Sequence, residues 1–146
     1  MIGTLRSGLA LIAIGSLLVS CSSSGPTSGP ISATVKEWDI TLSSTNIKAG
    51  DVTFNIKNDG DNDHEFVVVK TDLAPDALPV TDTGEVDEEG AGIEAIGELE
   101  DILVGTTDGT LTLTLPAGRY VAFCNVNADD NVHYQKGMHL AFTVSD

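Results

Sequence analysis

The sequence predicts an all-β domain, an antiparallel sandwich or barrel of short strands. From residue 34 onwards, apolar residues recur with a period of two, which is typical of strands with one buried face. Each apolar run ends in residues that favour turns, such as Gly, Pro, Asn and Asp. Aromatic residues are few and little of the chain has helical periodicity, so an antiparallel all-β fold is favoured.

The expected strands follow one another along the chain. The alternating apolar positions are Trp38, Ile40 and Leu42, then Val52, Phe54 and Ile56, then Leu111, Leu113 and Leu115. A denser apolar run, residues 66–69, follows His64 and predicts a central strand that is covered on both faces. Residues 119–124 and 140–144 predict two more strands near the C-terminus.

A long acidic insertion, residues 72–104, separates the central strand from the later ones. Within it, the stretch 92–103 has a spacing of three between its apolar residues, which are Ile93, Ile96, Leu99 and Ile102. This spacing predicts a short amphipathic helix, with an irregular surface loop as the alternative. The acidic loops 59–63 and 82–89 lack the ordered ligand pattern of a calcium site, so we expect them to be solvated.

The first 20 residues have the pattern of an export signal, because Arg6 precedes an apolar run over residues 9–19. That run is shorter than the roughly 20 residues of a spanning helix. Residues 18–21 (LVSC) resemble a bacterial lipobox, in which cleavage precedes Cys21 and the cysteine receives lipid. We therefore expect a signal peptide over 1–20, a flexible Ser/Gly/Pro linker over 21–33 and one folded domain over 34–146.

We therefore expect the protein on the outer face of the cell membrane, held there by its N-terminal lipid. A plain secretory signal with a secreted or periplasmic product, or an uncleaved anchor, is the alternative. Removal of residues 1–20 leaves six Lys and Arg against 22 Asp and Glu. Such acidity excludes nucleic acid as a partner and favours basic proteins, although it also serves solubility alone.

Cysteine usage points to a metal. Lipidation of Cys21 would leave Cys124 as the only thiol of an exported protein. An unpaired thiol outside the cytoplasm is open to oxidation, so its presence calls for burial, intermolecular pairing or metal ligation.

Four residues form the candidate metal site. Cys124 ends one expected strand, His133 lies in the following loop, Met138 begins the last strand and His64 opens the central strand. A thiolate and two imidazoles in a plane, with a weak axial thioether, form the ligand set of electron-transfer copper sites. Met138 shares its strand parity with the expected core residues after it, whereas His139 has the opposite parity and is expected at the surface.

Three stretches carry a resemblance to a known family. Residues 64–68 (HEFVV), 118–125 (GRYVAFCN) and 133–138 (HYQKGM) resemble the cupredoxins, the small blue-copper proteins of the plastocyanin and azurin type. The resemblance implies an eight-stranded Greek-key sandwich with one copper at one end. It also implies that His133 is the ligand nearest the surface and that electrons pass through its exposed edge.

Two features depart from the family pattern. Glu65 holds a place that is often Asn or a small polar residue, and we expect it to bond towards Asn125 as part of the surroundings of the metal. Eight residues, 125–132, lie between Cys124 and His133, more than is common in the family. A loop of this length can still return to the same point.

The expected function is that of a monomeric one-electron carrier between redox proteins. A copper storage, delivery or resistance lipoprotein on the same fold is the alternative, but such proteins add exposed Met or His ligands, and the chain after residue 20 has no second Met. A copper enzyme is not expected, because a catalytic centre needs further histidines and only His139 is spare.

Overall fold

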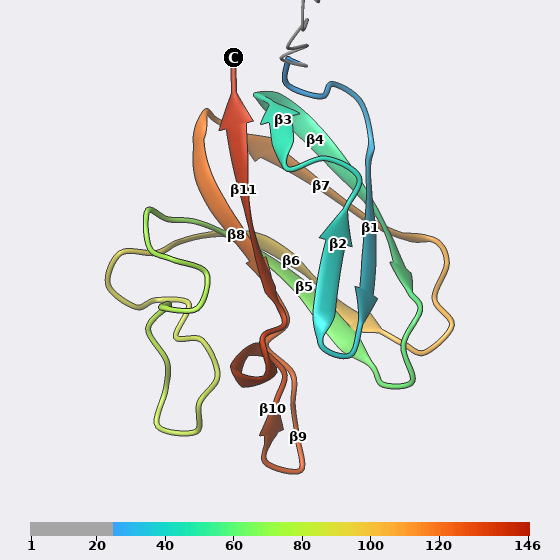
Figure 1. The fold of residues 1–146 in the computed structure, drawn as a ribbon, viewed down its shortest axis with the longest axis vertical. Coiled ribbons are helices and arrows are strands. Elements are labelled where there is room, and N and C mark those ends of the chain that lie inside the picture. The colour runs from blue at the N-terminus through green and yellow to red at the C-terminus, as the bar shows by residue number, and fades with distance from the viewer. Residues whose placement is uncertain (1–24) are drawn as a thin grey trace, which may run out of the picture.

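The computed structural model describes residues 25–146, which form two large β-sheets packed against each other and a small two-stranded one (Figure 1). One sheet has the strand order β2-β1-β4-β7, with bounds β1 Ile31–Lys36, β2 Asp39–Leu42, β4 Gly50–Asn58 and β7 Gly109–Leu115. The other has the order β3-β11-β8-β5-β6, with bounds β3 Asn46–Lys48, β5 His64–Lys70, β6 Glu94–Ile102, β8 Gly118–Phe123 and β11 His139–Ser145. The predicted all-β sandwich is confirmed. Its sheets are mixed rather than purely antiparallel, because β1 pairs parallel with β4 and β3 pairs parallel with β11.

The main core lies between the two sheets and is built from the inward residues of the alternating strands. Phe54 of β4 packs against Phe66 of β5 and Phe142 of β11, with ring centroids 5.3 and 6.1 Å apart. The ring of Tyr120 stacks on Phe142. These aromatic contacts join the two sheets at the middle of the sandwich.

The central strands β5 and β8 are covered on both faces, as the apolar run after His64 predicts. Their outer face carries Val67, Val69, Val121 and Phe123, all of which are buried. Leu78 and Val86 of the insertion cover this face, together with Val132 and Tyr134 near the C-terminus. The acidic insertion is therefore a structural cover over the second sheet.

The helix predicted for residues 92–103 is wrong. This stretch forms β6, which pairs antiparallel with β5. The register shifts twice along the pair, and each shift is a bulge that places one extra residue in β6. Each bulge reverses the alternation of faces, so Ile96, Leu99 and Ile102 all pack against the main core despite their spacing of three.

The folded region begins earlier than the expected boundary at residue 34. β1 starts at Ile31, a wholly buried residue, and Thr27 forms an isolated parallel bridge with Ile47. The last part of the expected linker 21–33 thus belongs to the sandwich. The expected signal peptide 1–20 and Cys21 lie outside the described residues. Within residues 25–146, no helix is long and apolar enough to cross a membrane.

The long segment between Cys124 and His133 folds as a β-hairpin. β9 (Asn127–Ala128) pairs with β10 (Asn131–Val132), and Asp129 and Asp130 form the two-residue turn with φ of 53° and 62°. Positive φ at both central residues is the requirement of the tight turn that suits a twisted hairpin. The hairpin projects from the lower end of the molecule and returns the chain, so that the His133 amide donates to the Val126 carbonyl at 2.9 Å (Figure 1).

Candidate metal centre

Three of the four predicted ligand residues come from separate segments and meet at one end of the sandwich. Cys124 directly follows β8, His64 is the first residue of β5, and His133 precedes a short 3-10 helix, η1 (Tyr134–Lys136). Because β5 and β8 are antiparallel neighbours, the start of one lies near the end of the other. The topology therefore joins His64 to Cys124 across 60 positions of sequence.

The donor atoms of these residues form a compact triangle. Nδ1 of His64 lies 3.2 Å from Nδ1 of His133, and Sγ of Cys124 lies 3.3 Å from Nδ1 of His133 and 3.8 Å from Nδ1 of His64. A point equidistant from the three atoms is about 2 Å from each, close to the roughly 2.0–2.3 Å bonds that first-row metals form with imidazole and thiolate. No other group of His, Cys, Asp or Glu converges in this way in residues 25–146.

The chemistry of the donors agrees with copper. One thiolate and two imidazoles suit a metal that accepts both soft and intermediate ligands and exchanges one electron. His64 and Cys124 are 0% exposed and His133 is 1% exposed, so the triangle is closed to bulk water. The residues present fit one type 1 copper site.

Met138 lies beside this triangle in the chain and in the core. It is wholly buried in the same apolar cluster as Cys124. Its carbonyl accepts the Cys124 amide at 3.1 Å, and its own amide donates to the His133 carbonyl at 3.2 Å. Its backbone is therefore tied to two of the donor residues, and its thioether stays the predicted axial ligand.

Burial sets the protonation of the donors in the metal-free protein. It raises the pKa of the Cys124 thiol to about 11, although backbone N–H groups of Glu65 and Val126 act in the opposite direction. Burial also lowers the pKa of His64 and of His133, and for His133 the neighbouring His64 lowers it further. The two imidazoles are therefore neutral near pH 7 with lone pairs available, whereas the thiol must lose its proton to bind a metal.

Glu65 and Asn125 both lie next to the centre, but they do not bond to each other as expected. Glu65 contributes its backbone amide, which donates to Sγ of Cys124 at 3.3 Å. The Asn125 side chain instead holds the insertion: it accepts from the Val86 amide and donates to the Val86 carbonyl and to Glu88. The insertion had no predicted partner in the sequence, so this contact could be found only from the fold.

The expected exposed edge of His133 is not present. The Trp38 indole packs against the His133 imidazole with ring centroids 4.9 Å apart and planes at 70°. Trp38 itself lies in the turn between β1 and β2, not on the inward face of a strand as its spacing from Ile40 predicts. The turn between the two strands therefore covers the histidine that resemblance placed nearest the surface.

Glu37 is a second residue at this turn that the sequence analysis missed. Its Oε1 lies 3.2 Å from Nε2 of His64. Burial alone would raise the pKa of the Glu37 carboxyl, but backbone N–H groups of Glu37, Asp61 and Asn62 outweigh it and lower the pKa to about 2. Neither Glu37 nor Trp38 belongs to a motif, and only their place in a turn at the site end marks them.

His139 stays outside the donor group. It is half-buried, on the face opposite the main core, and its ring lies 5.3 Å from that of Tyr134. The parity argument thus placed it on the correct face, although the side chain is less exposed than expected.

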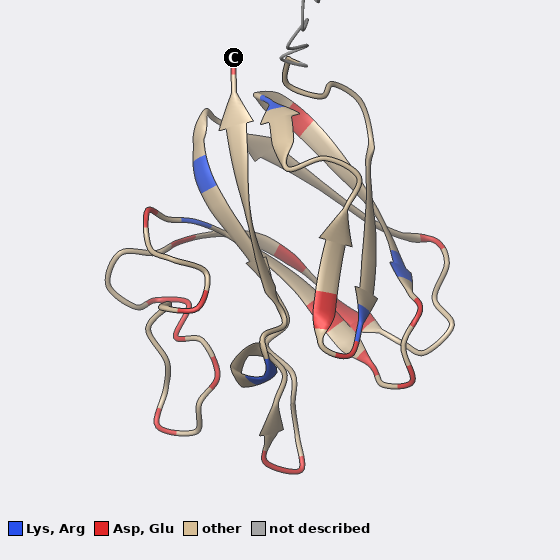
Figure 2. Ribbon diagram, viewed as in Figure 1, with Lys and Arg blue, Asp and Glu red and all other residues tan. Residues whose placement is uncertain are grey.

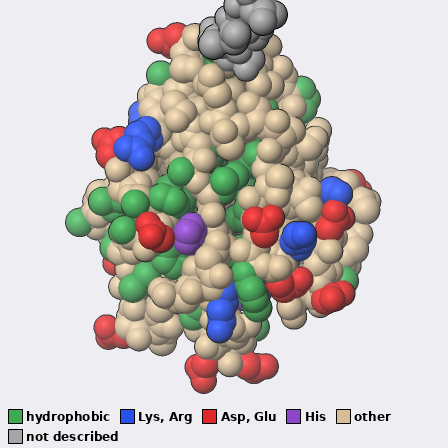
Figure 3. All heavy atoms as spheres, viewed as in Figure 1, with side chains coloured by type: hydrophobic (Ala, Val, Ile, Leu, Met, Phe, Trp, Pro, Cys, Tyr) green, Lys and Arg blue, Asp and Glu red, His purple; other side chains and the backbone are tan. Residues whose placement is uncertain are grey.

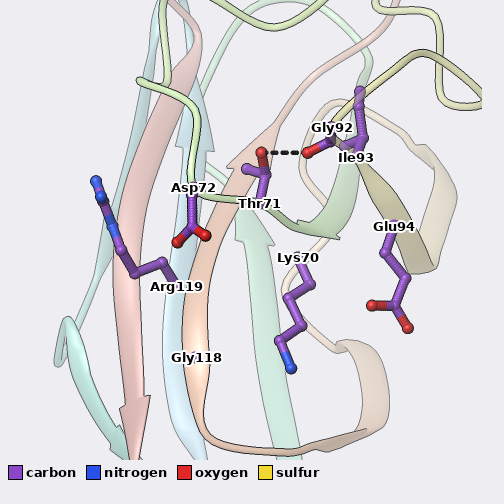
Figure 4. Close-up of a pocket in the computed structure, with 8 residues that line it drawn as sticks. All are labelled: Lys70, Thr71, Asp72, Gly92, Ile93, Glu94, Gly118 and Arg119. Atoms are coloured by element: carbon purple, nitrogen blue, oxygen red, sulfur yellow. Dashed lines mark hydrogen bonds between the residues drawn. The ribbon is translucent and has the colours of Figure 1, made fainter.

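A cavity of about 410 Å³ lies at the other end of β5 and β8, away from the metal centre (Figure 4). Thr71 closes one side by donating to the Gly92 carbonyl at 2.7 Å. The charged residues of its lining are Lys70, Arg119, Asp72 and Glu94. The lining thus holds two basic and two acidic residues, with no excess of either charge.

The comparisons with known proteins agree with the fold. Auracyanin from the photosynthetic bacterium Roseiflexus castenholzii is similar in structure, with a TM-score of 0.54 and 24% identity over 82% of this chain and 98% of that one. Auracyanin B has a TM-score of 0.53 and 17% identity over 80% of this chain and 88% of that one. Rusticyanin from Thiobacillus ferrooxidans has a TM-score of 0.53 and 15% identity over 83% of this chain and 86% of that one.

No family model matches the sequence, and the comparison with curated proteins found no relative. The structural likeness therefore establishes the fold, which is that of the blue-copper cupredoxins. The donor triangle of this chain, taken from its own atoms, adds the type 1 copper site to that fold.

Proposed function

We propose that the protein is a type 1 copper protein that carries single electrons between redox proteins. The observation that carries the proposal is the buried triangle of one thiol sulfur and two imidazole nitrogens at the end of a cupredoxin sandwich. Copper bound there supplies a one-electron couple, Cu(I)/Cu(II).

The surrounding chain favours fast electron transfer by limiting movement. His64 begins a central strand, Cys124 is held by the Met138 carbonyl and the Glu65 amide, and His133 is held by the hairpin. Ligands fixed in this way change position little when the metal changes charge, so little reorganisation opposes the transfer.

The burial of the three donor residues also argues against the two alternative functions, copper delivery and copper catalysis. A copper delivery protein must present its metal to an acceptor, yet all three donors are closed to solvent. A copper enzyme needs a substrate position at the metal, and Trp38 and the apolar core occupy the surroundings instead.

The partner proposed here is a basic redox protein that docks at the site end. The loops around the centre carry acidic residues: Figure 2 marks them along the lower part of the ribbon, and Figure 3 shows acidic side chains on the lower part of the visible face. The exposed members close to the centre in the chain are Asp39, Asp61, Asp63, Asp129 and Asp130. A surface of one sign attracts partners of the opposite sign and speeds their association at low salt.

The test is the spectrum of the copper-loaded protein. We expect an intense visible copper-thiolate absorption that disappears on reduction and returns on oxidation, with the paramagnetic signal of one type 1 centre. Cys124→Ser should abolish the band while keeping the fold. A colourless copper-loaded protein, or a blue Cys124→Ser variant, would contradict the proposal.

The delivery alternative needs a separate measurement. The carrier should show rapid electron self-exchange by NMR and keep its copper when mixed with a copper chelator. Slow self-exchange together with ready copper transfer would favour delivery instead.

Attachment to the outer face of a membrane is the remaining part of the proposal, and it comes from the lipobox-like residues 18–21. We expect the full chain expressed in a bacterium to fractionate with membranes, and Cys21→Ala to release it. An unchanged distribution in that variant would argue against lipid attachment.

A further inference from the structure

The ring of His64 has two different sides. Its Nδ1 faces the donor triangle, while its Nε2 faces Oε1 of Glu37 at 3.2 Å. Nε2 is fully buried and makes no hydrogen bond of standard geometry in residues 25–146, so the Glu37 contact is its one polar neighbour there. The carboxylate of Glu37 is therefore the acceptor within reach of a buried imidazole nitrogen.

The Glu37 carboxylate is itself held in place by the loop between β4 and β5. The Asp61 amide donates to both oxygens, at 3.0 and 3.1 Å, and the Asn62 amide donates to Oε1 at 2.6 Å. Gly60 allows this approach, because a Cβ at residue 60 would lie 2.7 Å from both carboxylate oxygens. The loop forms a cradle for the carboxylate, and a side chain at residue 60 would displace that carboxylate.

The contact decides which ring nitrogen holds the proton. A nitrogen that faces a carboxylate carries the proton, and the other nitrogen then has a free lone pair. A metal-binding histidine is commonly oriented in this way by a carboxylate on its far side. In this chain the carboxylate comes from a turn between two strands of the opposite sheet, so its position depends on the packing of the sandwich.

We propose that Glu37 is the positioning residue of His64: it holds the proton on Nε2, keeps Nδ1 open to copper, and stabilises Cu(II) relative to Cu(I) through its negative charge. The part that concerns copper rests on the proposed function. The part that concerns the tautomer does not, because it applies to the metal-free protein as well.

The first experiment is nitrogen-edited proton NMR of the histidine rings in the metal-free protein. We expect His64 to be protonated at Nε2 and unprotonated at Nδ1. Glu37→Ala should shift a measurable fraction of His64 to the other tautomer, while the signals of His139 stay in place. Gly60→Ala keeps the carboxylate but crowds its cradle, so it should produce the same shift to a smaller extent.

The second experiment measures the reduction potential of the copper-loaded protein. Glu37→Gln keeps an oxygen for the amides and for His64 but removes the charge. We expect the affinity for Cu(II) relative to Cu(I) to fall about tenfold, which raises the potential by about 59 mV. Asp61→Asn is the matched control, since it removes one charge from an exposed side chain of the same loop and should shift the potential much less.

Equal shifts in Glu37→Gln and Asp61→Asn would show a general charge effect and overturn the role proposed for copper. An unchanged His64 tautomer in Glu37→Ala would overturn the positioning role. If the wild-type protein bound no copper, the proposed function would fail, yet the NMR measurement would still decide whether Glu37 positions His64.

Discussion

The imidazole of His133 lies under the indole of Trp38, edge to face at 4.9 Å, and is 1% exposed. The indole, which is itself half-buried, thus covers this side of the His133 imidazole. Any partner or chelator that approaches from this side meets Trp38 before it meets His133.

Replacement of Trp38 should open the site. We expect Trp38→Ala to lower the free energy of unfolding of the metal-free protein by about 1–2 kcal/mol, since the residue is half-buried, and to speed copper removal by a chelator. Denaturant unfolding and stopped-flow loss of the blue band measure the two effects. Trp38→Phe keeps a ring over His133 and should retain most of the protection; equal rates in the two variants would rule out shielding by the ring.

The stability of the metal-free protein should fall as the pH drops below about 6.5. The pKa values of buried His64 and His133 are lowered, so below the ordinary value of about 6.5 the unfolded chain binds protons that the folded protein does not. Each histidine contributes at most about 1.4 kcal/mol per pH unit until the pH reaches its lowered pKa.

Urea unfolding between pH 5 and pH 7 measures this dependence. Other groups also contribute to the pH dependence, because burial lowers the pKa of His139 and raises the pKa of the Glu65 and Glu88 carboxyls. The His133→Gln variant keeps these groups, so the difference in slope between the wild-type protein and the variant reports on His133. The slope should be smaller in the variant, and identical slopes would mean that His133 does not contribute.

The hydroxyl of Tyr134 should anchor the insertion to the sheet. It donates to the Pro75 carbonyl at 2.9 Å and accepts from the buried Leu78 amide at 3.0 Å. Tyr134→Phe leaves these groups without a partner, so we expect a loss of about 1–3 kcal/mol and faster hydrogen exchange in residues 72–90. Tyr120→Phe is the matched control, since its hydroxyl donates to Pro116 and should leave exchange in the insertion unchanged.

Residues that prefer positive φ should stabilise the turn of the β9–β10 hairpin. We expect the double variant Asp129→Asn with Asp130→Gly to be more stable by about 0.5–1 kcal/mol. Changing both residues to Asn removes the same charge and should gain less. Thermal unfolding of the two variants separates the backbone effect from the charge effect, and a destabilised Asn-Gly variant would contradict the turn described here.

Much of the fold could be predicted from local pattern. The period of two in Val52, Phe54 and Ile56 depends only on alternation of side chains along a strand, and these residues do face the core. The dense run after His64 indicated a strand covered on both faces, and β5 is such a strand. The stretch 92–103 was assigned wrongly because bulges change the face of a residue, and a bulge is decided by pairing with another strand.

The sequence by itself determined which donors the site can have, because an unpaired thiol, one histidine and one methionine stand at the ends of predicted strands and a second histidine lies in the loop between two of them. Only the tertiary structure decided what surrounds them. The turn between β1 and β2 brings Glu37 to His64 and Trp38 to His133 across the sandwich. The Asn125 side chain bonds to Val86 of the insertion instead of Glu65. The physical reason is that ligand type follows from the chemistry of single side chains, whereas solvent exposure and the acceptor of a buried ring nitrogen depend on residues that are close only after the sheets have packed.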